Sequence, residues 1–450
     1  MASHTTADQL CTPAVAFCSG ELPTEGSAVM CSMTVEDSET DHTTNAFEAY
    51  PEGGWKAYSV LFGAWCALLP PSGLLNSIGS LQAYLLSNQL KEYTESEIGW
   101  IFSVFAFLFF FGGLQAGPIF DSYGLKVLII PGSIGFLASL IVLASCEEYY
   151  QFMLGFSVLG GLSASLIWTS TIATIGHWFS ARRGLATGLA TTVGGIGGII
   201  FPILIQTLIP RVGYSWTIRI IAFICVGFSA VAVALMSTRL PSNTAKKTGF
   251  DFQGFTDKRF TLTIAAIFVI DLAVLVPPSF ITTYALAHGV DPAFSYQLLA
   301  ILNAASVIGR GLPGIIADRW GRFNVMILSS LGCTLLILAL WMFAGDSVVA
   351  ITMFSILFGV FSGTAYSLTP VCVSQLCRTE DYGTRYGTAY GLVSFATLAG
   401  IPVSGMILGG HGGGNYKGLI WFCGVLYAVA TGLFTLARAF GSGWKLLKIY

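Results

Sequence analysis

Long apolar runs constrain the fold of this chain more than any other feature. About twelve runs, each able to cross a bilayer core of roughly 30 Å as a helix, occur in the sequence. The 450 residues are 54% hydrophobic and only 10% charged, whereas an average soluble domain is about 25% charged. The sequence therefore predicts an all-α membrane protein with twelve transmembrane helices. The runs are 57–86, 97–117, 126–145, 150–176, 183–208, 215–238, 260–287, 294–316, 324–344, 347–372, 384–409 and 416–440.

A glycine–aspartate motif occurs twice, each time between two apolar runs. The copies contain Gly117, Asp121, Gly124 and Lys126, and Gly314, Asp318, Arg319, Gly321 and Arg322. The two aspartates are 197 residues apart, which is close to half of the apolar part of the chain. This repeat predicts two pseudo-symmetric six-helix bundles. Two repeats around one shared site are the architecture of a secondary transporter.

Polar stretches set the expected domain boundaries. We expect a disordered acidic tail (1–54), a first bundle (55–240), a linker (241–259), a second bundle (260–441) and a short tail (442–450). The first fifty residues contain no Lys or Arg, and they lack the basic start and apolar core of a signal peptide. Sixteen Lys and Arg fall on one side of the expected spans and four on the other, which predicts that both termini are cytoplasmic.

The sequence gives no sign of catalysis. It has no Walker-type phosphate loop and no His/Cys/Asp cluster with metal-ligand spacing. The ten cysteines are scattered, which does not indicate a disulfide framework. No basic groove with interleaved aromatic residues indicates nucleic-acid binding. We therefore expect a monomer without metal or cofactor, with a small-molecule substrate, the lipid bilayer and protons as its partners.

Both copies of the glycine–aspartate motif can brace neighbouring helices. Glycine permits a tight turn and close helix approach, and a carboxylate can accept hydrogen bonds at a helix N-terminus or pair with an arginine. Contacts of this kind, formed in one conformation only, would act as a latch for alternating access. The candidate latch residues are Gly117, Asp121, Gly124, Arg182, Arg183, Asp318, Arg319, Gly321 and Arg322.

Three further stretches resemble the monocarboxylate porter family of the major facilitator superfamily. Glu52-Gly-Gly-Trp55 is similar to the element before that family's first span, and 177–197 is similar to its fifth-span signature. Asn303–Arg310 resembles the fungal branch. The resemblance covers 52–440 and implies transport of a monocarboxylate-like anion or a related metabolite, with proton coupling open. Export of a fungal secondary metabolite is the alternative, and a sensor that does not transport is a remote third.

The chain departs from that family at charged positions in the spans. The family's first-span lysine falls at Asn76, and an aspartate one turn before Arg310 is replaced by Ser306. A guanidinium at membrane depth is costly unless it meets water, a partner or an anion. Arg310 therefore either binds substrate, with Asn303 and Asn76 beside it, or pairs permanently with an acidic residue of another helix.

Asp271 is the acidic residue that lies well inside an apolar run. A carboxyl group removed from water binds a proton more readily, so Asp271 is a candidate proton carrier. It is equally a candidate static counter-ion of Arg310, or a residue close enough to the interface to stay wet. The sequence leaves these alternatives open.

Two proline pairs occupy matching runs of the two halves. Proline removes a backbone donor and breaks or kinks a helix, and interrupted helices at matching positions point to a binding site and its gates. Pro70, Pro71, Pro277 and Pro278 are therefore candidate helix breaks. Polar and aromatic residues that are candidates for the pathway are Gln82, Gln115, Trp168, Gln206, Tyr284, Tyr366 and Gln375, of which Tyr284 is predicted to bind substrate.

Overall fold

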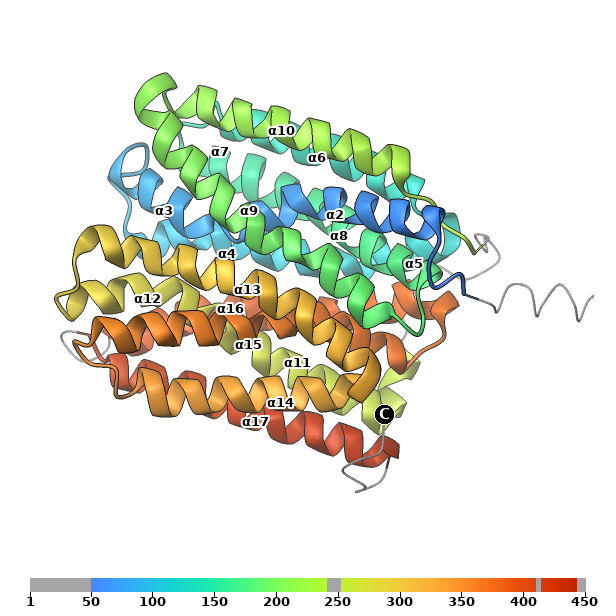
Figure 1. Cartoon of the computed structure of the whole chain (residues 1–450). Coiled ribbons are helices and arrows are strands. Elements are labelled where there is room, and N and C mark those ends of the chain that lie inside the picture. Colours follow the sequence, from blue (N-terminus) through green and yellow to red (C-terminus); the bar gives the residue numbers. More distant parts are fainter. Residues whose placement is uncertain (1–49, 241–251, 410–413, 443–450) are drawn as a thin grey trace, which may run out of the picture. The chain divides into compact units, whose positions relative to one another are not determined.

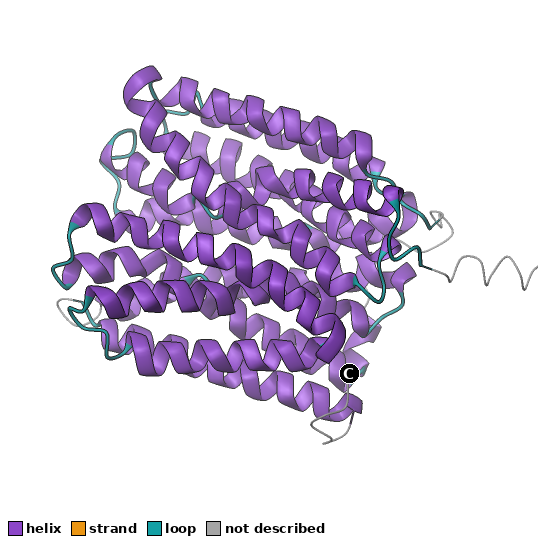
Figure 2. Ribbon diagram, in the orientation of Figure 1, coloured by secondary structure: helices purple, strands orange, loops and turns teal. Residues whose placement is uncertain are grey.

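The computed structural model describes residues 50–240, 252–409 and 414–442, and helices make up most of them (Figures 1 and 2). Within these ranges no strand is present, and twelve helical segments are long and apolar enough to cross a membrane. The predicted all-α fold with twelve spans is confirmed. The predicted tail up to residue 49, linker residues 241–251 and the end of the chain from 443 lie outside the described residues.

The first half of the described chain contains six spans, two of which consist of two consecutive α-helices. Its elements are α2 (Trp55–Leu75), α3 (Ile78–Ser87), α4 (Glu95–Phe111), α5 (Gly113–Tyr123), α6 (Lys126–Leu143), α7 (Tyr149–Gln151), η1 (Phe152–Val158), α8 (Leu159–Trp178), α9 (Arg183–Val212) and α10 (Tyr214–Leu235). The segment η1 has π-helical hydrogen bonding and runs directly into α8.

The second half repeats this order. Its elements are η2 (Phe252–Thr256), α11 (Lys258–Val274), α12 (Val276–Ala287), α13 (Pro292–Trp320), α14 (Arg322–Leu335), η3 (Leu336–Trp341), α15 (Val348–Gln375), η4 (Thr379–Asp381), α16 (Tyr382–Gly409) and α17 (Tyr416–Ser442). Like η1, η3 is a π-helical segment. The predicted spans thus match observed helices, with ends that differ by a few residues.

The two halves meet along two pairs of neighbouring helices. In one pair α9 packs against α13, and in the other α16 packs against α4 and α5. Backbones approach closely at glycines on these helices: a Cβ atom added to Gly117 would overlap the carbonyl oxygen of Gly383, and one added to Gly314 would overlap that of Gly184. We call this contact region the seam. Packing without side chains between backbones is typical of helices in lipid.

The first span of each half is interrupted near its proline pair. In the first half α2 contains Pro70 and Pro71 and ends at Leu75. In the second half α11 ends at Val274, and α12 begins at Val276 with a proline in its first turn, where the missing backbone N–H is not needed. Pro70 and Pro71 thus lie inside α2, before the break that follows Leu75, whereas Pro277 and Pro278 lie in the first turn of α12, directly after the break.

Candidate functional site

The halves are joined at the end of the bundle where α2 begins, which we call the Trp55 end. There the Asp121 carboxylate, at the end of α5, accepts hydrogen bonds from the backbone N–H groups of Gly383 (3.1 Å) and Thr384 (2.7 Å) and from the Thr384 hydroxyl (2.7 Å). These donors belong to the first turn of α16, where the helix dipole favours a negative charge. The first copy of the motif thus contacts the second half.

The second copy makes the reciprocal contact. The Asp318 carboxylate, near the end of α13, accepts from the backbone N–H groups of Gly184 (2.9 Å) and Leu185 (2.8 Å) in the first turn of α9. The Arg322 guanidinium lies 4.0 Å from Asp318 and donates to the carbonyl oxygen of Ser180. The seam is therefore closed at the Trp55 end by two carboxylates, each bound to a helix of the opposite half.

The remaining predicted latch residues have different surroundings. Gly124 and Gly321 end α5 and α13 with φ of 80° and 94°, a conformation that favours glycine. The buried Arg183 donates to the carbonyl oxygens of Phe179 (3.0 Å) and Gly176 (2.7 Å). The side chains of Arg182 and Arg319 are exposed.

Residues that the sequence assigns to the tail also join this end. The Glu52 carboxylate accepts from the three consecutive backbone N–H groups of 180–182, at 2.6 to 3.0 Å. The Tyr50 hydroxyl lies 2.6 Å from the Thr379 hydroxyl, which belongs to the second half. The segment 50–52 therefore crosses from the loop before α9 to the loop before α16.

A central pocket lies between the halves. Its lining residues are Leu75, Phe110, Trp168, Asp271, Val274, Leu275, Ala365, Tyr366, Thr369, Tyr390 and Thr397. Leu75, Val274 and Leu275 stand at the two helix interruptions, so the proline-associated breaks border the pocket. The lining is aromatic and aliphatic apart from two threonines, the tyrosine hydroxyls and one carboxyl group. Such a lining, mostly apolar with a few polar groups, is typical of small-molecule sites.

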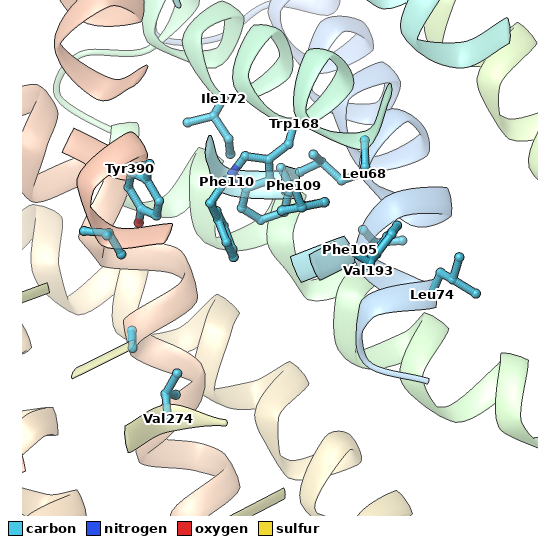
Figure 3. Packing of buried hydrophobic residues seen from close by; sticks show 14 of the residues in the cluster. Leu68, Leu74, Phe105, Phe109, Phe110, Trp168, Ile172, Val193, Val274 and Tyr390 are labelled. Atoms are coloured by element: carbon cyan, nitrogen blue, oxygen red, sulfur yellow. The ribbon is translucent and has the colours of Figure 1, made fainter. Parts of the chain in front are cut away.

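Aromatic rings from both halves form one wall of the pocket. The ring centroids of Phe110 and Tyr390 are 5.6 Å apart, and those of Phe110 and Trp168 are 6.5 Å apart. Figure 3 shows Phe110 beside Trp168, with Tyr390 on a helix of the other half. The indole N–H of Trp168 donates to the Tyr386 hydroxyl at 2.7 Å. In this conformation the rings pack against one another, and aromatic faces of this kind also stack on planar ligands.

Three tyrosines form a row along α16. Tyr382, Tyr386 and Tyr390 are four residues apart, so they share one helix face, and successive ring centroids are 5.7 Å and 4.4 Å apart. The Tyr382 hydroxyl donates to the carbonyl oxygen of Pro370, and the Tyr390 hydroxyl lies 2.6 Å from that of Thr369. The row connects the pocket with the Trp55 end of the seam.

Asp271 lies in the pocket, whereas Arg310 does not line it. Among the described residues no hydrogen bond or ion pair engages the Asp271 carboxylate, and Arg310 is not its partner. The two are separated by Tyr366, which lines the pocket and whose ring centroid lies 4.7 Å from the Arg310 guanidinium carbon. The alternative of a static Asp271–Arg310 pair therefore does not describe this conformation.

Arg310 and the two asparagines gather against α9 instead. Arg310 is only 3% exposed and donates to the carbonyl oxygen of Thr191 at 3.0 Å. The Asn303 amide donates to the carbonyl oxygen of Gly198 at 3.3 Å, and the Asn76 amide to that of Ser72 at 2.8 Å. Glycines make room for this cluster, since a Cβ atom on Gly194 would overlap the Arg310 guanidinium and lie 3.2 Å from the Asn76 amide nitrogen.

Several pocket residues differ from those expected. The predicted substrate ligand Tyr284 does not line this pocket; it packs against Trp341 and Tyr416, with ring centroids 5.8 Å and 5.3 Å away. Trp168 and Tyr366 were candidates for the pathway and do line it. Phe110 and Tyr390 were missed, although the four-residue spacing of the α16 tyrosines was a readable signal.

Comparison with known proteins agrees with the function that the fold indicates. The pattern described as the Major Facilitator Superfamily matches residues 59–396, which is most of the chain. The chain belongs to this superfamily. It is therefore a multi-pass membrane transporter and not an enzyme, as the sequence predicts. The finer placement in the monocarboxylate porter family is not confirmed by these comparisons.

Its relatives include transporters with named substrates. A riboflavin transporter of Saccharomyces cerevisiae is 31% identical over 93% of this chain and 84% of its own length. A fujikurins efflux protein of Gibberella fujikuroi is 34% identical over 90% of this chain and 87% of its own. An aspyridones efflux protein of Emericella nidulans is 33% identical, over 81% and 74% respectively.

Solved structures share the fold at low identity. A human organic anion transporter has a TM-score of 0.67 and 15% identity, with 85% of this chain and all of that one covered. The fucose:proton symporter of E. coli has a TM-score of 0.63 and 19% identity, with 84% and 98% covered. At these identities the likeness concerns the fold alone.

Proposed function

We propose that this transporter moves a planar aromatic solute of low charge through the central pocket by alternating access. The observation that carries the proposal is the lining of that pocket: aromatic rings from both halves surround one carboxyl group, and Arg310 stands behind Tyr366. The relatives are named for transport of riboflavin, fujikurins and aspyridones, which supports an organic metabolite as the solute.

Alternating access in this chain would depend on the two carboxylate contacts of the Trp55 end. Asp121 and Asp318 hold the first turns of α16 and α9, and these contacts are proposed to close this end of the seam to the solute. Opening this end separates each carboxylate from its helix N-terminus and requires contacts elsewhere to replace them. The predicted latch residues are thus proposed to set the balance between the two conformations.

Proton coupling is proposed to use Asp271. The carboxylate faces the pocket next to a helix interruption, without a cationic partner among the described residues. Intramembrane carboxyl groups that face a cavity are typical proton carriers of transporters. A carboxyl group that lines a pocket between the halves would exchange its proton with whichever side the pocket opens to.

We further propose a monomer in the cell membrane with both termini cytoplasmic, which places the Trp55 end on the cytoplasmic side. The support is the excess of Lys and Arg at that end, and the resemblance of 52–55 and 177–197 to monocarboxylate porters. An epitope tag is added at either terminus and detected with a labelled antibody. Binding of the antibody only after the cells are permeabilised would agree with this orientation.

A monocarboxylate-like anion is the second candidate substrate. The observation in its favour is Arg310, whose Nε has no hydrogen-bond partner among the described residues although it is buried. Such an unsatisfied donor is costly, and an anion that reached it after a movement of Tyr366 would satisfy it. Loss of uptake of a carboxylate in Arg310→Ala, with aromatic solutes unaffected, would favour this candidate.

A metabolite comparison tests the proposed function. Metabolites inside cells and in the medium are measured for the native host, a deletion strain, and deletion strains that carry wild type, Asp271→Asn or the control Asp346→Asn in an exposed loop. We expect an aromatic compound to accumulate on one side in the deletion strain and in Asp271→Asn, and Asp346→Asn to restore the wild-type distribution. An unchanged distribution in the deletion strain would contradict transport, and full activity of Asp271→Asn would contradict the proton role.

A further inference from the structure

Within the part of the chain that the structure describes, no charged side chain lines the pocket beside the Asp271 carboxyl group. No lysine, arginine or histidine is among the lining residues. An anion in this pocket would be repelled by the ionised Asp271 carboxylate, and no cationic side chain among the described lining residues would offset that repulsion. The ionised Asp271 carboxylate can therefore interact directly with a solute that enters this pocket.

The groups that face Asp271 from the surrounding helices are neutral or turned away. They are Tyr366 of α15, Tyr386 and Tyr390 of α16, Tyr427 of α17 and, behind the Tyr366 ring, Arg310 of α13. Tyrosine hydroxyls are neutral at physiological pH, and the guanidinium donates a hydrogen bond to the Thr191 carbonyl oxygen. From the first half, Leu75, Phe110 and Trp168 line the pocket and carry no titratable group. Among the described residues that line the pocket, Asp271 is thus the acidic group that can take up and release a proton.

A carboxylate beside aromatic faces selects one chemical class of ligand. The rings of Phe110, Trp168 and Tyr390 can stack on a planar ring and attract a cation by their π faces. The ionised Asp271 accepts hydrogen bonds and stabilises positive charge. The best ligand is therefore a planar aromatic molecule with a protonated amine or with N–H and O–H donors. A carboxylate on the same ring would be repelled.

We propose that the substrate and a proton compete for the Asp271 carboxylate, so that the transporter exchanges protons for planar aromatic amines or similar donors. This proposal rests on the proposed function and specifies its substrate class and direction. When the substrate donates to Asp271, the carboxylate has released its proton; when the substrate leaves, a proton takes its place. Exchange of one proton for one monovalent ammonium ion moves no net charge. With the proton gradient directed into the cell, this exchange exports the substrate.

Three indole compounds form a matched set of probes. Tryptamine carries an ammonium group, tryptophol a hydroxyl and indole-3-acetate a carboxylate on the same ring. Binding to the purified full-length protein is measured by titration calorimetry from pH 5 to pH 8, in buffers with different ionisation enthalpies, which reports the protons released. Asp271→Asn removes the charge with little change in shape, and Asp346→Asn in an exposed loop is the matched control.

We expect tryptamine to bind best at high pH. At pH values below those at which Asp271 titrates, the apparent Kd of tryptamine should rise by up to about tenfold for each unit by which the pH is lowered, since each binding event must then displace a proton. Binding should release close to one proton in that range. Indole-3-acetate should bind worst, and its affinity should not fall as the pH is lowered. Asp271→Asn should abolish the pH dependence for tryptamine, and Asp346→Asn should keep it.

Several outcomes overturn the proposal. They are uptake of a proton on tryptamine binding, a Kd independent of pH in the wild type, tighter binding of indole-3-acetate than of tryptamine, or no binding of any probe. The wild-type proton release alone decides the matter if Asp271→Asn does not fold. Proton-driven transport that is lost in Asp271→Asn without competition in the binding data would refute this inference while leaving the proposed function intact.

Discussion

Replacement of Asp121 by asparagine should shift the protein away from the conformation closed at the Trp55 end. The carboxylate accepts two backbone N–H groups and one hydroxyl from the first turn of α16. A hydrogen bond to a charged group contributes about 1.5–3 kcal/mol and a neutral one about 0.5–1.5 kcal/mol. The asparagine keeps one acceptor oxygen and loses the charge. Because Asp121 is partly exposed, we expect a loss of about 2 kcal/mol, which corresponds to about a 30-fold change in the conformational equilibrium.

Distance measurements between spin labels can detect this change. Labels on cysteines introduced at Lys126 and Arg319, which are exposed residues of the two halves, report the separation across the Trp55 end. Cys11, Cys18, Cys31 and the partly exposed Cys377 are replaced by serine to prevent their labelling. The short distance should dominate in the wild type and should give way to a longer one in Asp121→Asn. The rate of transport should fall more than substrate affinity.

The symmetry of the contacts provides the internal comparison. Asp318 accepts two hydrogen bonds where Asp121 accepts three, so Asp318→Asn should shift the equilibrium in the same direction by less. The effects should add in the double variant, since distant sites are independent. A label distance that stays short in both single variants would refute the idea that these carboxylates hold the halves together.

Three further changes test neighbouring contacts. Arg310→Ala should abolish transport at normal membrane abundance, measured by solute flux and immunoblot, because it removes the guanidinium from Thr191 and Tyr366; normal flux would refute a substrate or seam role. Gly117→Ala should lower the melting temperature and weaken closure, since its methyl group would overlap the Gly383 carbonyl; an unchanged melting curve would contradict the close packing. Glu52→Gln should weaken closure by about 1 kcal/mol, because it removes the negative charge that faces three backbone N–H groups. The same spin-label distances would measure this change. Unchanged distances would show that the segment 50–52 does not contribute to closure.

The spans were predictable because bilayer-length apolar runs leave few alternatives to a helix. The same holds for the contacts of Asp121 and Asp318, since a repeated motif at matching loops implies matching partners. The proline pairs Pro70–Pro71 and Pro277–Pro278 also indicated the spans in which the structure has a helix break. These inferences depend on one residue and its near neighbours in sequence, which the chain itself displays.

The pocket was less accessible to such reasoning. Whether an aromatic residue packs or faces a cavity depends on the rotation of its helix against helices far away in sequence, and the sequence records no such angle. Tyr284 and Tyr390 illustrate this, since both are aromatic residues in apolar spans, yet only Tyr390 lines the pocket. Likewise, the depth of Arg310 was evident, but its position behind the Tyr366 ring was not.

The helix α16 connects the central pocket with the Asp121 contact at the Trp55 end. Its first turn is held by Asp121, Tyr386 is bonded to Trp168, and Tyr390 lines the pocket. Tyr382 and Tyr390 are eight residues apart, which is about 12 Å along a helix. An α-helix is stiff over that length. A solute that displaces the backbone of α16 at Tyr390 therefore also displaces its first turn at Tyr382. Binding of a solute in the pocket would then weaken the hydrogen bonds between Asp121 and the first turn of α16.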